Sequence, residues 1–391
     1  MHAAPAIISP TFSNEKLRSF IQQAQPATPC LVLDVDRVEH NYLALKAAMP
    51  EASIFYAIKS NPAAPVLRRL AKLGSSFDCA SVNEIDMALE AGGTPERISF
   101  GNTIKKQRDI AAAYARGIRI YAFDSEMELH KLAESAPGSR VFCRILTSGE
   151  GADWPLSRKF GCEPDMAYDL LLKAHELGLK PWGVSFHVGS QQKNPKMWDE
   201  AVRSSARLFK KLEKKGIELS MINMGGGFPT IYQKPVPTAD EYGRAIHGSL
   251  TKHFGNAIPK TIIIEPGRGM VGDAGVVLSE VVLVATKSKT DPVRWVYLDI
   301  GKYGGLQETM DEAIKYPLET SKDTEAGTRS RVIIAGPTCD STDVLYEKAE
   351  YNLPDALEAG DFITFHSAGA YTTTYAAQSF NGFTPLAEHY I

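Results

Sequence analysis

Residues 53–93, SIFYAIKSNPAAPVLRRLAKLGSSFDCASVNEIDMALEAGG, contain the pattern that decides the fold. A short apolar run, SIFYAIK, precedes a segment with helical spacing, APVLRRLAKLG, and the order repeats with SSFDCA and VNEIDMALEAG. Strands that alternate with helices indicate parallel β/α units, and a glycine after the last apolar residue is a common helix stop. The stretch therefore predicts two successive β/α units.

The same alternation continues to about residue 272. Eight runs have the length and apolar content of buried strands: SIFYAIK, SSFDCA, RISFG, IRIYAFD, RVFCRIL, GVSFHV, MINMGGG and TIIIEPG. Segments with helical spacing, such as IKKQRDIAAAYARG and PDMAYDLLLKAHELG, separate them. Eight such units favour a closed (β/α)8 barrel of the TIM type over an open doubly wound sheet. We expect this barrel to cover residues 36–272.

The pattern changes after residue 272. The runs GVVLSEVVLVATKS, VRWVYLDIG, RVIIAGPTCDS and GDFITFHSAGAY follow one another without long helices between them. This succession predicts a mainly antiparallel β-domain. We expect it to comprise residues 273–391 together with residues 1–35, in which CLVLDV has the composition of another strand. A length of 391 residues agrees with two domains.

The composition is that of an ordinary globular protein, with 44% hydrophobic and 23% charged residues. The formal net charge of -3, without a basic run or a zinc-ligand spacing, argues against a nucleic-acid partner and against a metal site. The longest apolar runs are too short to cross a bilayer, and MHAAPAIISPTF lacks the features of a secretory signal. The five scattered cysteines are typical of free thiols, so we expect a cytoplasmic protein without a membrane partner.

Polar side chains follow several predicted strands, and the active sites of (β/α)8 barrels lie at the carboxyl ends of their strands. These residues are Lys59, Asp78, Arg144, His187, Ser190, Glu265 and Arg268, together with the glycines of GGGFP. Each has an ordinary explanation alone, because a lysine after a strand is usually solvated and a histidine is more often structural. Glycines likewise often mark tight turns. All of these residues are expected at one rim of the barrel, and this convergence outweighs the separate explanations.

This set of side chains suits pyridoxal 5'-phosphate. The amine of Lys59 can form a Schiff base with the cofactor aldehyde. Backbone N–H groups of GGGF and EPGRG can approach the phosphate closely, because glycine has no side chain. A carboxylate such as Glu265 can keep the pyridine nitrogen protonated, and the ring of His187 could lie against the cofactor. We also expect the apolar run before Lys59 to limit the hydration of its amine.

Seven motifs strengthen this interpretation: YAIKSNP, FDCAS, HVGSQ, GGGFP, EPGRGMV, GPTCDSTD and GAYTTTY…FNGF. In their order and spacing, from about Thr28 to Phe383, the chain resembles the pyridoxal-phosphate decarboxylases with an alanine-racemase-like barrel. Within that group it is most similar to the ornithine decarboxylases, especially the shorter bacterial ornithine/lysine forms. The resemblance implies the same fold, the same cofactor and decarboxylation of an amino acid.

The resemblance also implies roles for individual residues. Lys59 matches the Schiff-base lysine, and Asp78, Glu84 and Arg144 match polar groups that surround the lysine and the cofactor, with Asp78 and Arg144 expected to bind the cofactor. The positions that match the cofactor contacts of the family are His187, Ser190, Gly227, Glu265, Pro266, Gly267, Arg268 and Tyr371.

Further matches imply a homodimer with shared active sites. Cys339 matches a proton donor that the β-domain of the second subunit contributes, although a lone cysteine would more often be a small buried residue. Lys159 and Asp343 match positions that pair across the dimer. Phe380 has no secure role, because its spacing from Tyr371 is one residue longer than in the eukaryotic pattern.

Two acidic residues bear on the choice of substrate. Asp340 matches a carboxylate that receives the distal amine of the substrate, and Asp311 would add negative charge there. Diaminopimelate decarboxylases use an arginine in the stretch that matches QETMDEAIKYP, which here contains none. The resemblance therefore favours decarboxylation of L-ornithine to putrescine in polyamine synthesis, with lysine second. The two substrates differ by one methylene, worth about 1–3 kcal/mol in a pocket.

Other functions remain open at this point. Within the enzyme class, the chain could prefer lysine or could be a diaminopimelate or arginine decarboxylase. From another class, it could be a non-catalytic regulatory homologue that binds the cofactor. The presence of GPTCDSTD, GAYTT and the matched cofactor residues argues against that class.

Overall fold

The computed structural model describes residues 14–154 and 159–391. The part of the expected β-domain in residues 1–13 lies outside these described residues. The chain forms two compact units, which we call the barrel unit (Glu39–Pro229 and Val236–Gly269) and the β-unit (Met1–Val38, Thr230–Pro235 and Met270–Ile391).

Eight parallel strands of the described chain close into a barrel in the order β10-β11-β2-β3-β4-β5-β6-β8. Their bounds are β2 (Ala52–Ala57), β3 (Ser76–Cys79), β4 (Ile98–Phe100), β5 (Ile120–Phe123), β6 (Arg140–Arg144), β8 (Lys180–Ser185), β10 (Met221–Asn223) and β11 (Thr261–Ile264). Pairing of Ile262 with Ala52 and of Ile264 with Ile54 closes the ring. All eight predicted strands are therefore confirmed, as is the closed barrel.

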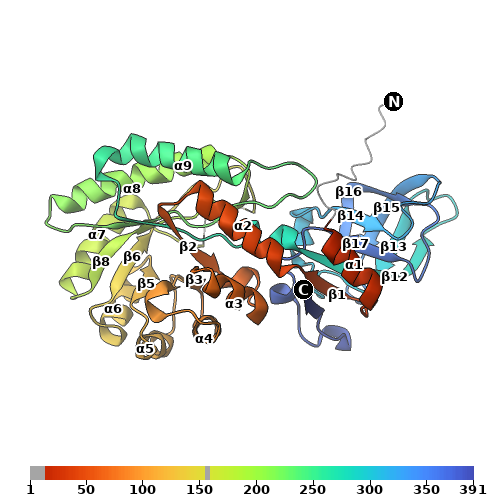
Figure 1. Cartoon of the computed structure of the whole chain (residues 1–391), viewed down its shortest axis with the longest axis horizontal. Helices are drawn as coiled ribbons and strands as arrows, with labels where there is room; N and C mark the ends of the chain where they lie inside the picture. The colour runs from red at the N-terminus through yellow and green to blue at the C-terminus, as the bar shows by residue number, and fades with distance from the viewer. Residues whose placement is uncertain (1–13, 155–158) are drawn as a thin grey trace. The chain divides into compact units, whose positions relative to one another are not determined.

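Helices follow the strands and cover the outside of the barrel (Figure 1). They are α2 (Val35–Ala48), which begins in the β-unit, α3 (Ala64–Lys72), α4 (Val82–Glu90), α5 (Gln107–Ala115), α6 (Glu126–Ser135), α7 (Pro164–Glu176), α8 (Trp198–Glu213) and α9 (Ala239–Phe254). An additional antiparallel pair joins β7 (Ala152–Trp154) to β9 (Ser190–Gln192). Buried side chains from β2, β5, β6, β10 and β11 pack together as one core: Phe55, Ile120, Ala122, Phe142, Met221 and Ile263.

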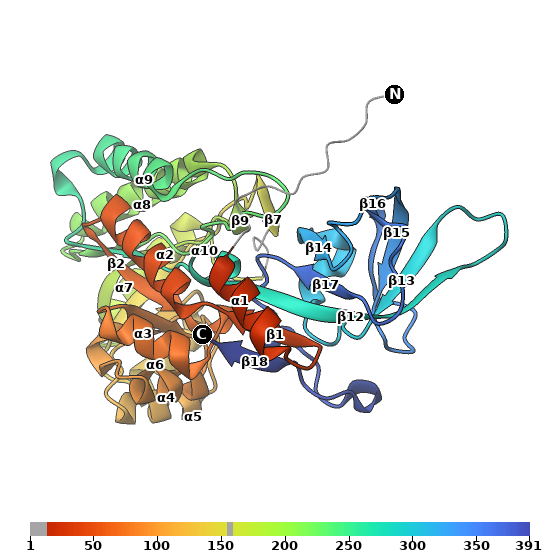
Figure 2. The same ribbon diagram turned by 45° about the vertical axis from the view of Figure 1, so that its right-hand side comes forward.

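The β-unit contains a mixed, mainly antiparallel sheet of eight strands within the described residues. Its elements are α1 (Glu15–Ala24), β1 (Cys30–Leu33), β12 (Gly275–Thr286), β13 (Arg294–Leu298), β14 (Leu318–Thr320), β15 (Arg329–Ala335), β16 (Val344–Pro354), β17 (Phe362–Phe365) and β18 (Ala387–Tyr390). The long strand β12 pairs with β1 and β17 along its first half and with β13 along its second (Figure 2). Two pairs, β1 with β18 and β13 with β15, are parallel.

The segment Thr230–Pro235 belongs to the β-unit, although the expected barrel range includes it. Ser367 Oγ donates a hydrogen bond of 2.6 Å to Ile231 O, and the ring of Tyr232 packs edge-on against Tyr316. Tyr316 lies in the main core of the β-unit together with Tyr346 and Phe365. This boundary depends on contacts with residues far away in the sequence.

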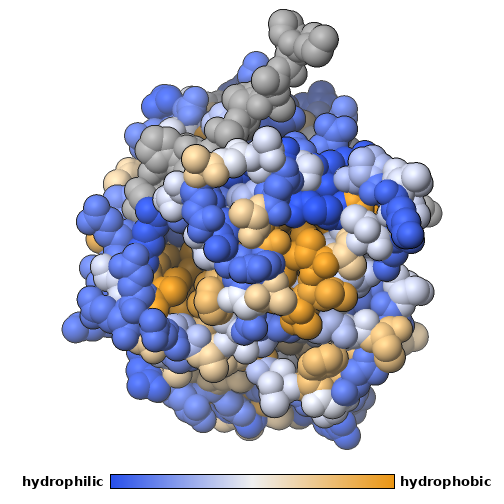
Figure 3. Space-filling model, turned by 90° about the vertical axis from the view of Figure 1, so that its right-hand side faces the viewer, coloured by the Kyte–Doolittle hydropathy of each residue, from blue (hydrophilic) through white to orange (hydrophobic). Residues whose placement is uncertain are grey.

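The face that Figure 3 shows is mainly polar, with hydrophobic residues gathered in patches on it. In the part of the chain that the structure describes, no helix is long and apolar enough to cross a membrane.

A buried ion pair joins two β/α units near the carboxyl end of β4. Lys105 Nζ donates to Asn102 O (2.6 Å) and to Ala122 O on β5 (2.7 Å), and it lies 3.0 Å from Glu128 Oε1 on α6. The two charged side chains are 0% and 2% exposed. Burial lowers the pKa of Lys105 to about 8, although Glu128 opposes the shift. The lysine thus ties the loop after β4 to β5.

We expect Lys105→Met to lower the free energy of unfolding by about 3 kcal/mol, because Glu128 would lose a buried partner. Urea denaturation measures this loss. Lys211→Met is the matched control, since Lys211 and Asp165 form an ion pair with side chains 58% and 89% exposed. Its loss should change stability by less than about 1 kcal/mol. Equal effects of the two variants would contradict a stabilising role for Lys105.

Candidate active site

Lys59 lies beyond the strand that precedes it. β2 ends at Ala57, and Lys59 is the central residue of a 3-10 turn, η2 (Ile58–Ser60). Ser60 Oγ, which donates to Ala57 O (2.9 Å), holds this turn. The prediction that Lys59 ends the strand is therefore wrong by one turn. Its side chain is exposed while both neighbours are buried, so the expected limit on its hydration is also wrong for this chain.

Three predicted charged groups lie around the carboxyl ends of the barrel strands, and the charge of Lys59 acts on two of them, Asp78 and Glu84. Burial raises the pKa of Asp78 on β3, whereas the charge of Lys59 opposes the shift. Burial raises the pKa of Glu84 on α4, and its hydrogen bond from Ala80 N opposes that. Burial lowers the pKa of Arg144 on β6, against the attraction of Glu265. Acids and bases from separate strands therefore share one electrostatic environment.

Glu265 follows β11 and is half-buried. Burial raises its pKa to about 8, and the negative charge of Asp78 acts in the same direction. Asn223 Nδ2 donates a hydrogen bond of 2.5 Å to Glu265 Oε1, and this bond opposes the rise. Gly225 N donates to Asn223 Oδ1 (2.9 Å), which fixes the orientation of the amide. The carboxylate is thus held at one oxygen and is poised to bind a cation.

His187 is neutral and held in one orientation. Burial lowers its pKa well below the usual range, and the positive charges of Arg144 and Lys59 add to this shift. Gly189 N donates to His187 Nδ1 (2.9 Å), so the remaining proton lies on Nε2. The ring therefore presents a flat, uncharged surface.

The predicted glycine loops have no room for side chains. A Cβ at Gly226 would lie 2.5 Å from Glu265 O and 3.4 Å from His187 Nε2, and one at Gly227, with φ +102°, would lie 2.6 Å from Gly189 O. At Gly267 it would lie 3.0 Å from Ser60 Cβ. Only glycine allows this close approach of backbone segments.

The residues around these loops fit a phosphorylated, cationic ring. Ala57 N donates to Pro266 O (3.0 Å), which joins the end of β2 to the EPGRG loop. Arg268 is 3% exposed, and its Nη2 and Nε donate to Ser190 Oγ at 3.3 and 3.4 Å. A guanidinium, a hydroxyl and glycine N–H groups suit a phosphate, and Glu265 suits a protonated ring nitrogen. This donor set fits pyridoxal 5'-phosphate.

The remaining predicted residues belong to the β-unit. Cys339 is exposed, and its Sγ lies 3.4 Å from Asn381 Oδ1. Asp340 Oδ1 accepts hydrogen bonds from Thr342 Oγ1 (2.6 Å) and Thr342 N (2.8 Å), which lower the pKa of the carboxyl. Tyr371 has a left-handed backbone, with φ 57°, and Asp311 does too, with φ 51°.

The carboxylate of Asp343 is hydrogen-bonded within its own chain. Asp343 is 2% exposed, and it accepts hydrogen bonds from Lys302 N (2.7 Å), Thr338 N (3.2 Å) and Thr338 Oγ1 (2.7 Å). Lys159, its expected partner across the dimer, is exposed and lies over the ring of Phe160. Asp343 therefore shapes its own unit, and the pairing with Lys159 stays a prediction.

Three polar residues of the site escaped the sequence interpretation, although each lies in or directly after a strand. Ser99 on β4 donates to Asp78 Oδ1 (3.2 Å), and Asn223 ends β10. Asp124 follows β5, accepts from Gly161 N (2.8 Å) and attracts Arg144. The same strand-end rule, applied to every strand, would have found them.

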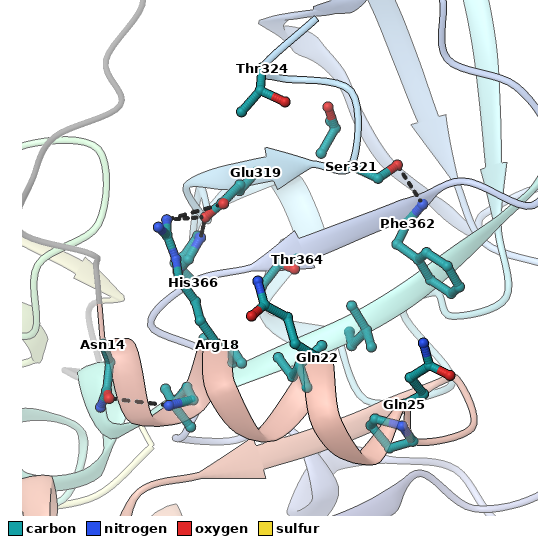
Figure 4. Close-up of a pocket in the computed structure, with 16 residues that line it drawn as sticks. Asn14, Arg18, Gln22, Gln25, Glu319, Ser321, Thr324, Phe362, Thr364 and His366 are labelled. Atoms are coloured by element: carbon teal, nitrogen blue, oxygen red, sulfur yellow. Dashed lines mark hydrogen bonds and ion pairs between the residues drawn. The ribbon is translucent and has the colours of Figure 1, made fainter.

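A separate cavity of about 690 Å³ lies in the β-unit between α1, β12, β14 and β17, and none of the predicted site residues lines it. Arg18 and His366 both bind Glu319 there, at 2.9 Å each (Figure 4). The hydrogen bond from His366 lowers the pKa of Glu319.

The chain is similar to known proteins in both sequence and fold. The family described as "Pyridoxal-dependent decarboxylase, pyridoxal binding domain" matches residues 35–272. A lysine/ornithine decarboxylase of Selenomonas ruminantium is 35% identical over 360 residues, which are 91% of this chain and 88% of that protein. An ornithine decarboxylase of Schizosaccharomyces pombe is 35% identical over 362 residues, 90% of this chain and 81% of the other. The solved lysine/ornithine decarboxylase of Vibrio vulnificus complexed with cadaverine superposes with a TM-score of 0.85 at 30% identity, over 97% of this chain and 99% of that one.

The raised pKa of Glu265 predicts a pH-dependent stability of the cofactor-free protein. The pKa of Glu265 rises to about 8 on folding, so the folded state holds this proton more tightly than the unfolded state does. The resulting stabilisation is fully present below the unfolded pKa of the acid and is lost as the pH rises to about 8. Between about pH 6.5 and 8 we expect unfolding free energy to fall by roughly 1 kcal/mol per pH unit. His187 opposes this slope only near the lower end of the range, because its pKa falls on folding and the imidazole of the unfolded chain, with an ordinary pKa of about 6.5, is mostly neutral above pH 7.

Urea denaturation across this range should show a smaller slope for Glu265→Gln than for the wild type. Glu134→Gln, which removes an exposed glutamate on α6, should keep the wild-type slope. An unchanged slope in Glu265→Gln would mean that another group takes up the proton.

Proposed function

Because this chain belongs to the pyridoxal-dependent decarboxylases, we propose that it converts L-ornithine to putrescine and CO2. The observation that carries the choice of substrate is the acidic turn at Asp311, which lines a cavity of about 520 Å³ in the β-unit. A distal ammonium group binds favourably beside a carboxylate, and residues 307–317 hold no arginine for a second carboxylate.

The barrel residues have separate tasks in this reaction. Bound pyridoxal 5'-phosphate supplies an aldehyde that condenses with amines and a ring that accepts electrons from the bond to the leaving carboxylate. Lys59 provides the amine that holds the cofactor, and its exposure allows a substrate amine to replace it. Glu265, with its pKa of about 8, ionises when a cation lies beside it and so keeps the proton on the ring nitrogen. Arg268, Ser190, Gly227 and Gly267 bind the phosphate.

The β-unit supplies the acid and the specificity. We assign protonation of the substrate α-carbon to Cys339 of the partner subunit, so the proposed enzyme is an obligate homodimer. The thiol lies against the amide oxygen of Asn381, which orients the S–H group. Protonation at the α-carbon gives the amine, whereas protonation elsewhere would give transamination. Asp311 and Asp340 bind the distal ammonium.

A lysine-preferring decarboxylase is the second candidate, and the relative from Selenomonas ruminantium supports it, since its name includes both substrates. We also propose a cytoplasmic location, which the five free cysteines support.

We expect kcat/KM for ornithine to exceed that for lysine by about tenfold, the discrimination that one methylene allows in a pocket. Steady-state kinetics of the holoenzyme with each amino acid measures this ratio. In Lys59→Ala both the visible absorption band of the cofactor and the activity should disappear. A higher kcat/KM for lysine would make lysine the principal substrate, and a wild type without such a band would contradict the catalytic role.

Shared active sites predict complementation between inactive subunits. Lys59→Ala and Cys339→Ala homodimers should each be nearly inactive, because every site lacks one residue. After subunit exchange, an equal mixture should recover about one quarter of wild-type activity, since half of the dimers are mixed and each has one intact site. Mixtures that exchange subunits but stay inactive would show that each site belongs to one chain.

A further inference from the structure

The turn that carries Asp311 has an unusual backbone. Asp311 has φ 51° and ψ 18°, and the next residue, Glu312, has φ 56°. Neither residue is glycine, and left-handed conformations of side-chain-bearing residues are uncommon. Two in succession persist only where the surrounding structure holds them. A specific contact must therefore maintain this turn.

That contact comes from an irregular part of the neighbouring sheet. Val332 of β15 pairs with Tyr351 of β16, and Ile334 pairs with Tyr346. A step of two residues along β15 therefore corresponds to a step of five residues along β16. The intervening residues of β16 form a bulge and have no Cα partner on β15. Their backbone N–H groups need another acceptor, because an unpaired backbone donor is costly.

The carboxylate of Glu312 is this acceptor. Its Oε1 accepts from Glu347 N (2.8 Å) and Lys348 N (2.6 Å), and its Oε2 accepts from Ala349 N (2.7 Å). Lys315 Nζ also donates to Glu312 O (2.6 Å), so both the side chain and the main chain of this residue are held. Partial burial raises the pKa of Glu312, but the three N–H groups outweigh it and the net shift is downward.

We propose that Glu312 is a positioning residue that places the Asp311 carboxylate for the distal ammonium of the substrate. This inference rests on the proposed function, because it assumes that Asp311 binds this group. Asp311 is exposed and lines the cavity beside Met310 and Gln307. Glu312 anchors the adjacent residue to the bulge, so the reach of the Asp311 carboxylate depends on it. This anchoring of Glu312 therefore determines which length of amino-acid side chain brings its distal ammonium to Asp311.

The test compares holoenzyme variants on ornithine, on lysine and on norvaline, which has the carbon chain of ornithine but no distal ammonium. Glu312→Gln replaces one acceptor oxygen by an NH2 group that cannot accept from the bulge. We expect it to raise KM for ornithine about tenfold, with kcat changed less than about threefold. The ornithine-to-lysine ratio of kcat/KM should also change, whereas turnover of norvaline should not. Glu350→Gln, an exposed acid in the same bulge that lies outside the cavity lining, is the control for loss of charge and should behave as the wild type.

A double-mutant cycle separates positioning from a structural role. In an Asp311→Asn background, Glu312→Gln should have little further effect on KM for ornithine, because it acts through Asp311. Additive effects, or an equal loss on norvaline, would overturn the proposal. If Glu312→Gln does not fold, Glu312→Asp keeps the charge with a shorter reach, and an unchanged KM in that variant would also overturn it. An unaltered KM for ornithine in Asp311→Asn alone would instead contradict the proposed substrate contact.

Discussion

The partial burial of Glu265 among other ionisable groups is the constraint on which the barrel site depends. A carboxylate removed from water costs several kcal/mol unless it is paired or hydrogen-bonded. Here Asp78 adds a second buried acid, and Lys59 and Arg144 supply the compensating positive charge. The hydrogen bond from Asn223 stabilises the ionised form. The site is therefore tuned to accept a cation, and a protonated pyridine ring is a cation of suitable shape.

Closure of the barrel makes this concentration of charge possible. Asp78, Arg144, Asn223 and Glu265 come from positions up to 187 residues apart in the chain, and the ring of parallel strands brings their carboxyl ends to one rim. Side chains from strands around the ring fill the core, which keeps the strand ends in fixed positions. Glycine at position 226 allows the loops after β10 and β11 to approach each other closely. A rigid scaffold is needed because small displacements would leave these buried charges without partners.

Much of this fold could be predicted from the sequence, since hydrophobic runs and helical spacing are local signals. The eight barrel strands and the mainly antiparallel sheet follow from them. The features that escaped depend on distant contacts. The parallel pairing of β13 with β15 and the attachment of Thr230–Pro235 to the β-unit have no local signature. Lys59 was placed one turn early, because a 3-10 turn after an apolar strand resembles a continuation of that strand. Asn223 ends β10, so its place at the rim has a local signal, whereas its hydrogen bonds with Gly225 and Glu265 are recognisable only in three dimensions.

Three acidic residues of the β-unit also have environments that the sequence alone does not distinguish. Asp343, Glu312 and Asp311 are the same kind of group in the sequence, yet they have different environments. Asp343 and Glu312 bind backbone N–H groups of their own unit, which a carboxylate does more strongly than a neutral acceptor. Asp311 is exposed to a cavity. The distinction depends on where β-bulges and turns leave N–H groups without partners, and sheet register decides that. A carboxylate that satisfies backbone donors, as that of Glu312 does, holds its own turn in place, while the neighbouring Asp311 faces the cavity.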